Sequence, residues 1–253
     1  MSYLAQAIGE LKSQIHAYLQ QSTNELVRFQ VKLDKVDLLA WLKGQSAYPQ
    51  FYLHFRDEAK ALAALGEERS FSQLNLAQEF IEESGFPLVG GLQFQGTAQF
   101  VLPKILVEQD EKGALVSFFL KDEQSANDTL AHLKTFENIT ALSALPKQIP
   151  LHTEPRANER TWCDWVNQAL VEIKSGELTK IVLANETTFH LKQAINAYDF
   201  LAESEKQNQG CYHFLWAENP HSVFVGSTPE RLFAREYNLL LTEALAGTAS
   251  ISK

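Results

Sequence analysis

The chain has 253 residues, of which 45% are hydrophobic, so it is long enough to bury one large core or two smaller ones, and disorder is excluded. Its net charge is -9, and no run of lysine or arginine provides the basic surface that nucleic acid or an anionic membrane would need. Cys163 and Cys211 are the only cysteines and have no CxxC spacing, which predicts a cytoplasmic protein without a disulfide framework or structural zinc. No apolar stretch approaches membrane-spanning length, and Glu10 and Lys12 lie in the N-terminal segment, so we expect neither a secretion signal nor a membrane anchor.

The first half of the chain alternates helical and strand patterns. An amphipathic helix that covers a sheet is predicted by apolar residues at spacings of three and four, namely Leu4, Ile8, Leu11, Ile15 and Leu19. Asp37 is expected to cap a short helix through Leu42, and two further helices are predicted at 72–83, with Leu76, Phe80 and Ile81 facing inward, and at 126–136. Strands are predicted at 26–33, 51–55, 87–94, 99–109 and 114–120, with 110–113 as a hairpin turn. We interpret Gly90-Gly91 as a bend or bulge rather than a ligand site.

The second half begins with a proline-containing stretch at 140–158 that has no clear periodicity and is the best candidate for a linker. We therefore divide the chain into an N-terminal sheet-and-helix region at 1–148 and a second region at 149–253. Helices are predicted at 159–174 and 196–206, and a strand runs from about Lys180 to 191. Four strands at 211–217, 222–226, 231–235 and 239–241 are expected to form an antiparallel meander. The order of elements predicts an α+β fold with large, mainly antiparallel sheets covered by helices.

Four motifs resemble those of one enzyme family, and they follow one another along the chain in the order found in that family. GSTPERLF at 226–233, followed by TEALAGT at 242–248, is similar to the paired signature of the chorismate-utilising enzymes. Upstream, TKIVLA at 179–184 resembles the strand of that family that carries a lysine, and GGLQF at 90–94 resembles its glycine-rich early strand. Within the family the chain is most similar to the isochorismate synthases, and its N-terminal half resembles the menaquinone-type enzymes more than the siderophore-type enzymes.

The resemblance implies conversion of chorismate to isochorismate, in which water attacks C2 and the C4 hydroxyl leaves. Such a reaction needs one base and one acid, and the resemblance assigns these roles to Lys180 and Glu243. The lysine would have to be neutral, through desolvation or a nearby positive charge, and the glutamate protonated, through burial or a nearby negative charge. The resemblance also implies that Ala246, Gly247 and Thr248 bind a substrate carboxylate, although a plain tight turn explains these three residues equally well. Without the resemblance, Lys180 is interpreted as a solvated strand end and Glu243 as a surface residue.

Two positions distinguish branches of the family. Anthranilate synthases typically have glutamine at the position of Lys180, and aminodeoxychorismate synthases have lysine at the position of Ala246, so both residues favour isochorismate. Asn185 departs from the arginine that many relatives have after this strand. Residues 227–230 are interpreted as a structural turn. A salicylate synthase, a siderophore-pathway isochorismate synthase and a non-catalytic binding protein stay open as alternatives.

Family members continue well beyond the TEALAGT turn, whereas this chain stops at Lys253. The resemblance implies a magnesium cofactor whose carboxylate ligands lie in the absent segment, so no metal ligand is assigned here. We therefore expect a fragment with little activity, with chorismate as the small-molecule partner and an open oligomeric state. Unpaired edges at 210–241 and a tendency to associate are also expected.

Overall fold

The computed structural model describes residues 3–20, 25–56 and 58–245, with side chains described from Ile8 onward. The chain divides into two compact units, which are described separately below. Unit 1 consists of Met1–Ala144 and Asn196–Lys253, and unit 2 of Leu145–Ile195. Unit 1 thus takes residues from both sides of the boundary predicted between 148 and 149, and that division into domains stays a prediction.

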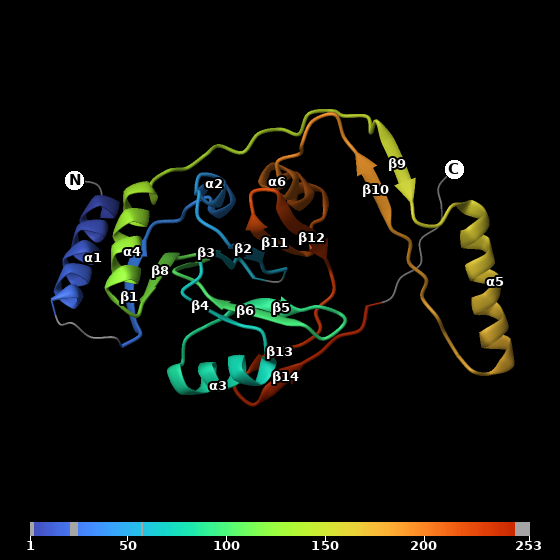
Figure 1. Cartoon of the computed structure of the whole chain (residues 1–253), viewed down its shortest axis with the longest axis horizontal. Helices are drawn as coiled ribbons and strands as arrows, with labels where there is room; N and C mark the ends of the chain where they lie inside the picture. The colour runs from blue at the N-terminus through green and yellow to red at the C-terminus, as the bar shows by residue number, and fades with distance from the viewer. Residues whose placement is uncertain (1–2, 21–24, 57, 246–253) are drawn as a thin grey trace. The chain divides into compact units, whose positions relative to one another are not determined.

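A seven-stranded sheet forms the centre of unit 1 (Figure 1). Its strand order is β1-β8-β7-β3-β2-β11-β12, and every neighbouring pair is antiparallel. The strands are β1 (Val27–Leu33), β2 (Gln50–His54), β3 (Ala61–Leu65), β7 (Ile105–Asp110), β8 (Gly113–Leu120), β11 (Tyr212–Asn219) and β12 (Ser222–Thr228). Strand β11 pairs with β2 over five residues, so segments from both ends of the sequence share one sheet.

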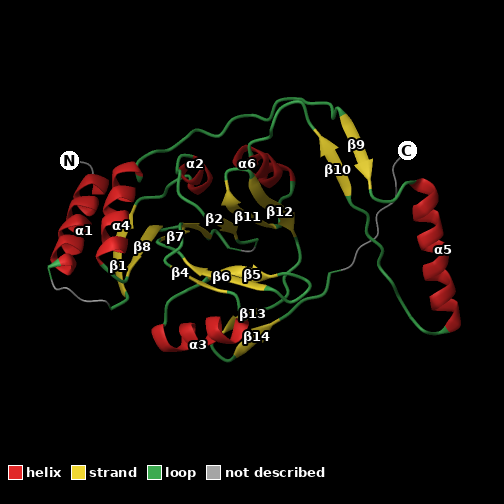
Figure 2. Ribbon diagram, in the orientation of Figure 1, coloured by secondary structure: helices red, strands yellow, loops and turns green. Residues whose placement is uncertain are grey.

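Four helices cover one face of this sheet (Figure 2): α1 (Tyr3–Leu19), α2 (Leu38–Lys43), α4 (Glu123–Thr135) and α6 (Ala197–Gln207). The predicted apolar stripe of α1 is confirmed from Ile8 onward, because Leu11 and Ile15 are buried in the same core cluster as Val116 of β8, whereas the side chain of Leu4 lies outside the described residues. As predicted, the Asp37 side chain caps α2 by accepting a hydrogen bond from the backbone N–H of Ala40 at 3.0 Å. None of the described helices is long and apolar enough to cross a membrane.

The opposite face of the sheet packs against a smaller sheet and one helix. The smaller sheet has the order β4-β6-β5, from β4 (Arg69–Phe71), β6 (Ala98–Leu102) and β5 (Val89–Leu92), and the helix is α3 (Leu74–Ser84). Helix α3 buries Ala77 and Phe80, whereas Leu76 and Ile81 are exposed, so the prediction for those two was wrong. The buried face of α3 includes Ala77, which the prediction had not placed among the inward-facing residues. Gly90 has φ +150° and lies in a regularly paired strand, so a close approach between strands, and not a bulge, explains this glycine.

Three strand predictions need correction. The single strand predicted at 99–109 is two strands, β6 and β7, in different sheets, because Pro103 interrupts the ladder of backbone N–H donors. Strands β3 and β4 were not predicted, since the sequence ALAAL of β3 lacks the β-branched and aromatic residues typical of strands. The predicted meander divides into two sheets: β11 pairs with β12, whereas β13 (Ala234–Glu236) and β14 (Leu239–Leu241) form a separate pair. The predicted α+β class with a large antiparallel sheet is confirmed.

Unit 2 contains α5 (Glu159–Ser175) and a two-stranded ladder of β9 (His152–Pro155) and β10 (Thr187–His190). The helix predicted at 159–174 is present; the Asn158 side chain caps its start by accepting from the N–H of Thr161, and Gly176 ends it in the left-handed conformation. The strand predicted from Lys180 onward is wrong in its first part, because residues 180–186 have no regular structure. The strand begins only at Thr187 because its partner β9 has four residues, which pair with residues 187–190.

An ion pair joins the places where the chain leaves and re-enters unit 1. The Lys43 ammonium lies 2.7 and 2.9 Å from the two carboxylate oxygens of Asp199 in α6. It also donates to the carbonyl of Ala141, while the N–H of Ser143 donates to Asp199 at 2.8 Å. Asp199 therefore fixes the segment before unit 2 against the helix that follows it.

Candidate active site

The predicted acid, Glu243, lies just after β14, where Arg56 donates a hydrogen bond to it and Arg231 forms an ion pair with it. Its Oε2 is 2.9 Å from Nη2 of Arg56, and its Oε1 is 3.3 Å from Nε of Arg231. The Glu243 side chain is 22% exposed and those of Arg56 and Arg231 are 13% and 26% exposed, so the cluster is half-buried. Both carboxylate oxygens are thereby directed toward guanidinium groups.

Arg56 reaches this position from the connection between β2 and β3. Its guanidinium carbon lies 5.2 Å from the centre of the Tyr212 ring, in cation–π geometry. Its Nη1 donates to the carbonyl oxygen of Pro229, while Nη2 donates to Glu243. One side chain thus joins the start of β11, the turn after β12 and the segment that carries Glu243.

The turn predicted at 227–230 begins later than expected, because Ser227 and Thr228 are the last paired residues of β12; the hydrogen bonds of both residues are nevertheless those of a structural element. The Thr228 hydroxyl accepts from the N–H of Glu230 at 3.1 Å. The Ser227 hydroxyl lies 2.7 Å from Nδ1 of His213 and 2.8 Å from the hydroxyl of Ser204. His213 is buried, and burial lowers the pKa of its imidazole, which suits a neutral core histidine. The anchored turn positions the arginine that follows it beside Glu243.

The predicted base, Lys180, lies in unit 2 in the irregular segment before β10 and is exposed. Among the described residues, no hydrogen bond or ion pair involves Lys180. The end of its segment is fixed, because the Asn185 amide both donates to and accepts from the backbone of Ala157, at 2.8 and 3.0 Å. Lys180 and Glu243 belong to different compact units, so no single unit brings them together, and both assignments stay predictions.

The remaining site predictions concern the substrate-binding residues, the surroundings of the acid and the metal. Ala246, Gly247 and Thr248 lie outside the described residues. The acid was expected to be buried or to have a negative neighbour, whereas the neighbours described above are positive guanidinium groups. Within the described ranges, no group of three or more His, Cys, Asp or Glu side chains is arranged to hold a metal ion.

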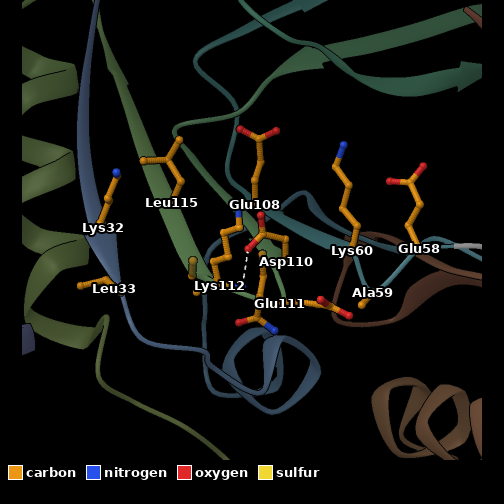
Figure 3. A pocket seen from close by; sticks show the side chains of 13 residues that line it. Lys32, Leu33, Glu58, Ala59, Lys60, Glu108, Asp110, Glu111, Lys112 and Leu115 are labelled. Carbon is orange, nitrogen blue, oxygen red and sulfur yellow. Dashed lines mark hydrogen bonds between the residues drawn. The ribbon is translucent and has the colours of Figure 1, made fainter. Parts of the chain in front are cut away.

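Two pockets of unit 1 lie away from Glu243. One, of about 670 Å³, is lined largely by lysines and carboxylates, among them Lys32, Lys60, Glu108, Asp110 and Lys112 (Figure 3). The other, of about 780 Å³, is mainly apolar and lies between β11–β12 and β5, with Phe51, Trp216 and Phe224 in its lining. Neither pocket includes a predicted site residue, so neither contributes to the candidate active site.

Sequence reasoning missed the two arginines. Arg231 was quoted in the family motif but received no role. Arg56 is a lone arginine after a strand and is separated from Glu243 by 187 positions, so no local pattern could have connected the two. Only the pairing of β2 with β11 brings the end of β2 toward the C-terminal segments.

The helix-covered antiparallel sheet and the candidate site can now be compared with known proteins. Residues 92–253 match the family described as "Chorismate binding enzyme", and the chain belongs to that family.

Several relatives named as isochorismate synthases are similar to the chain. The chain is 94% identical over its whole length to the isochorismate synthase MenF of Haemophilus influenzae, and 46% identical over 98% of its length to that of Pasteurella multocida. It covers 59% and 58% of these two proteins, respectively, and so spans less than two thirds of their length. The solved structure of MenF, the menaquinone-specific isochorismate synthase from Escherichia coli, matches 91% of the chain with a TM-score of 0.82 at 27% identity, and the chain covers 56% of it.

Proposed function

We propose that the chain supplies part of an isochorismate synthase, which converts chorismate to isochorismate for menaquinone synthesis in the cytoplasm. The observation that carries the proposal is the 94% identity, over all 253 residues, to a protein with that activity. The match to the E. coli structure supports it, because the same class of fold is shared over most of the chain. A menaquinone-specific relative favours this pathway over siderophore synthesis.

In the proposed reaction, the oxygen of water forms a bond to C2 of the ring while the bond between C4 and its hydroxyl breaks, and the two ring double bonds shift between these positions. Lys180 takes the proton that the attacking water loses, and Glu243 gives a proton to the departing hydroxyl. Ala246, Gly247 and Thr248 offer backbone N–H groups and a hydroxyl to a substrate carboxylate. The hydrogen bond from Arg56 and the ion pair with Arg231 support a defined place for this carboxyl group, but their positive charges favour its ionised form and so do not support its role as the acid.

Magnesium is a hard cation that requires several oxygen ligands, and the described residues do not fit such a site. No step above is therefore assigned to the ion. We place its ligands in the part of the relatives that this chain does not cover, and we expect the chain by itself to turn over little chorismate.

The test is chorismate consumption with magnesium, followed by chromatographic separation of products. The chain would be compared with the same chain continued by the part of the Haemophilus relative that it does not cover. We expect isochorismate from the continued chain, little from the chain alone, and none from the continued chain carrying Lys180→Ala. Salicylate as the product, or no consumption by the continued chain, would contradict the proposal.

A further inference from the structure

Asn185 attaches one end of the segment that carries Lys180 to the start of α5. Its amide nitrogen donates to the carbonyl oxygen of Ala157 at 2.8 Å, and its amide oxygen accepts from the N–H of Ala157 at 3.0 Å. Beside this contact, the backbone N–H of Arg156 donates to the carbonyl of Glu186 at 2.8 Å. These bonds continue the ladder of β9 and β10 toward Lys180, with the amide of Asn185 in place of a backbone group.

The other end of the segment is attached to the last turns of α5. Gly176 ends the helix in the left-handed conformation, and the N–H of Leu178 then donates to the carbonyl of Glu172 at 3.4 Å. From there the segment runs back to β10 (Figure 1). Lys180 therefore lies between two attachment points at opposite ends of one helix, and both belong to unit 2.

The length of α5 forces this segment into an extended conformation. From Asn158 to Glu172 the helix rises about 21 Å, at 1.5 Å per residue. The chain from Leu178 to Asn185 reaches at most about 25 Å when it is fully extended. The residues between the two attachment points are therefore close to straight, although 180–186 are not part of a strand.

The exposure of the side chains alternates along this segment, as an extended backbone requires. Val182 is 79% exposed, whereas Ile181 is 41% exposed and Leu183 is half-buried. Ile181 and Leu183 therefore share the covered side with Asn185, and Lys180 shares the open side with Val182. A shift of the anchor by one residue would exchange the two sides.

We infer that Asn185 is a positioning residue of the proposed isochorismate synthase: its amide anchors the segment that carries Lys180 and so determines the side from which the predicted base acts. The inference rests on the proposed function, because it assigns a consequence for turnover to this anchor. Asn185 is also the position at which the chain departs from the arginine of many relatives. An arginine side chain has donors only and could not accept the N–H of Ala157, so the anchor depends on both halves of the amide.

The first part of the test measures the two sides of the segment in the chain as it stands. Val182→Cys and Leu183→Cys are made separately in a background of Cys163→Ser with Cys211→Ser, and the rate of reaction with a maleimide is measured for each. Val182→Cys should react about fivefold or more faster than Leu183→Cys, because the reaction requires an accessible thiol. With Asn185→Ala added, this ratio should fall below about twofold.

The second part measures turnover in the continued chain described above. Asn185→Ala and Asn185→Asp should each lower kcat about tenfold or more, while KM for chorismate changes less than about twofold, because a displaced base affects the chemical step and not binding. Asn185→Asp keeps the size of the side chain and its acceptor, but it has no donor for the carbonyl of Ala157.

Asn158→Ala is the matched control for this second part. It removes a side-chain cap from the same helix, where Asn158 accepts from the N–H of Thr161 at 3.0 Å, and it leaves both ends of the Lys180 segment attached. It should lower the unfolding midpoint and change kcat less than about twofold.

The two parts separate the possible failures. A labelling ratio that Asn185→Ala leaves unchanged, an unchanged kcat in Asn185→Ala, or full activity of Asn185→Asp would each overturn the inference. An equal loss of kcat in Asn158→Ala would also overturn it, since a merely structural role predicts that result. If the continued chain makes no isochorismate, the proposed function is wrong, the assigned role in turnover fails with it, and the labelling ratio still decides whether Asn185 determines the two sides of the segment.

Discussion

The ion pair between Lys43 and Asp199 should be a main support of unit 1, and Asp199→Asn tests this. The substitution keeps the shape of the side chain but removes its charge, so the Lys43 ammonium keeps its positive charge with only neutral partners. The side chains of Lys43 and Asp199 are only 12% and 10% exposed, and the carboxylate also accepts from the N–H of Ser143. The loss therefore affects α2, α6 and the segment before unit 2 together.

The expected magnitude follows from the burial of the pair. Breaking a buried ion pair by removing one partner costs roughly 3–5 kcal/mol, whereas an exposed pair contributes roughly 0–1 kcal/mol. Because both side chains keep a little contact with solvent, we expect the lower end of the buried range, about 3 kcal/mol in the free energy of unfolding. Replacing both partners by apolar side chains, as Lys43→Met with Asp199→Leu, should recover much of this loss, since no unpaired charge is left.

The assay is urea unfolding of each variant, with calorimetry as a second measurement. Lys206→Gln is the matched control, because Lys206 lies on the same helix, α6, and its ion pair with Glu203 is exposed. The control should leave the unfolding midpoint where it is. If Asp199→Asn shifts the midpoint no more than Lys206→Gln does, the ion pair does not support unit 1 and the reasoning is refuted.

Three further predictions concern stability. Gly90→Ala should destabilise unit 1 by about 2 kcal/mol or more, because a Cβ there would lie 2.1 Å from the carbonyl oxygen of Gln99 at a φ of +150°; an unchanged melting temperature would contradict this. Burial raises the pKa of the Glu68 carboxyl from 4.5 to about 7, so the folded state binds this proton more tightly than the unfolded state does. The stability of the original chain relative to Glu68→Gln should therefore fall as pH rises from about 4.5 to 7. A difference in melting temperature that stays constant over this range would contradict the prediction. Trp41→Phe should lower the free energy of unfolding by about 1–2 kcal/mol, because the buried carbonyl of Phe136 loses the indole donor at 3.0 Å. A smaller loss in urea titration would contradict this prediction.

Elements with a local signal were predictable from the sequence. The apolar stripe of α1, the Asp37 cap of α2 and the helix α5 each depend on residues within one or two turns of the chain. Strand β3 was missed because alanine and leucine favour helices over strands, and its identity depends on the partners β2 and β7 on either side. Local chemistry thus predicts elements more reliably than it predicts sheets.

Contacts between distant segments were not predictable from a single sequence. The pairing of β2 with β11 joins the N-terminal and C-terminal strands in one sheet, yet the sequence of neither strand indicates which strand it pairs with. The hold of Arg56 on Glu243 depends on that pairing. Sequence resemblance supplied Lys180 and Glu243 as candidates, whereas the arginines beside the glutamate became visible only through the fold.

The expected unpaired edge is present in part. Strand β12 is an end strand of the seven-stranded sheet, and Phe224 on it is 68% exposed. The tendency to associate stays a prediction, because an exposed edge favours pairing between chains without requiring it.

The central claim is tested most directly by supplying chorismate and magnesium to the continued chain in water enriched in ¹⁸O. The account predicts isochorismate that carries one ¹⁸O atom in its C2 hydroxyl, since water attacks at C2 and the C4 hydroxyl leaves. Unlabelled isochorismate would contradict the attack by water, and salicylate or unchanged chorismate would contradict the proposed function itself.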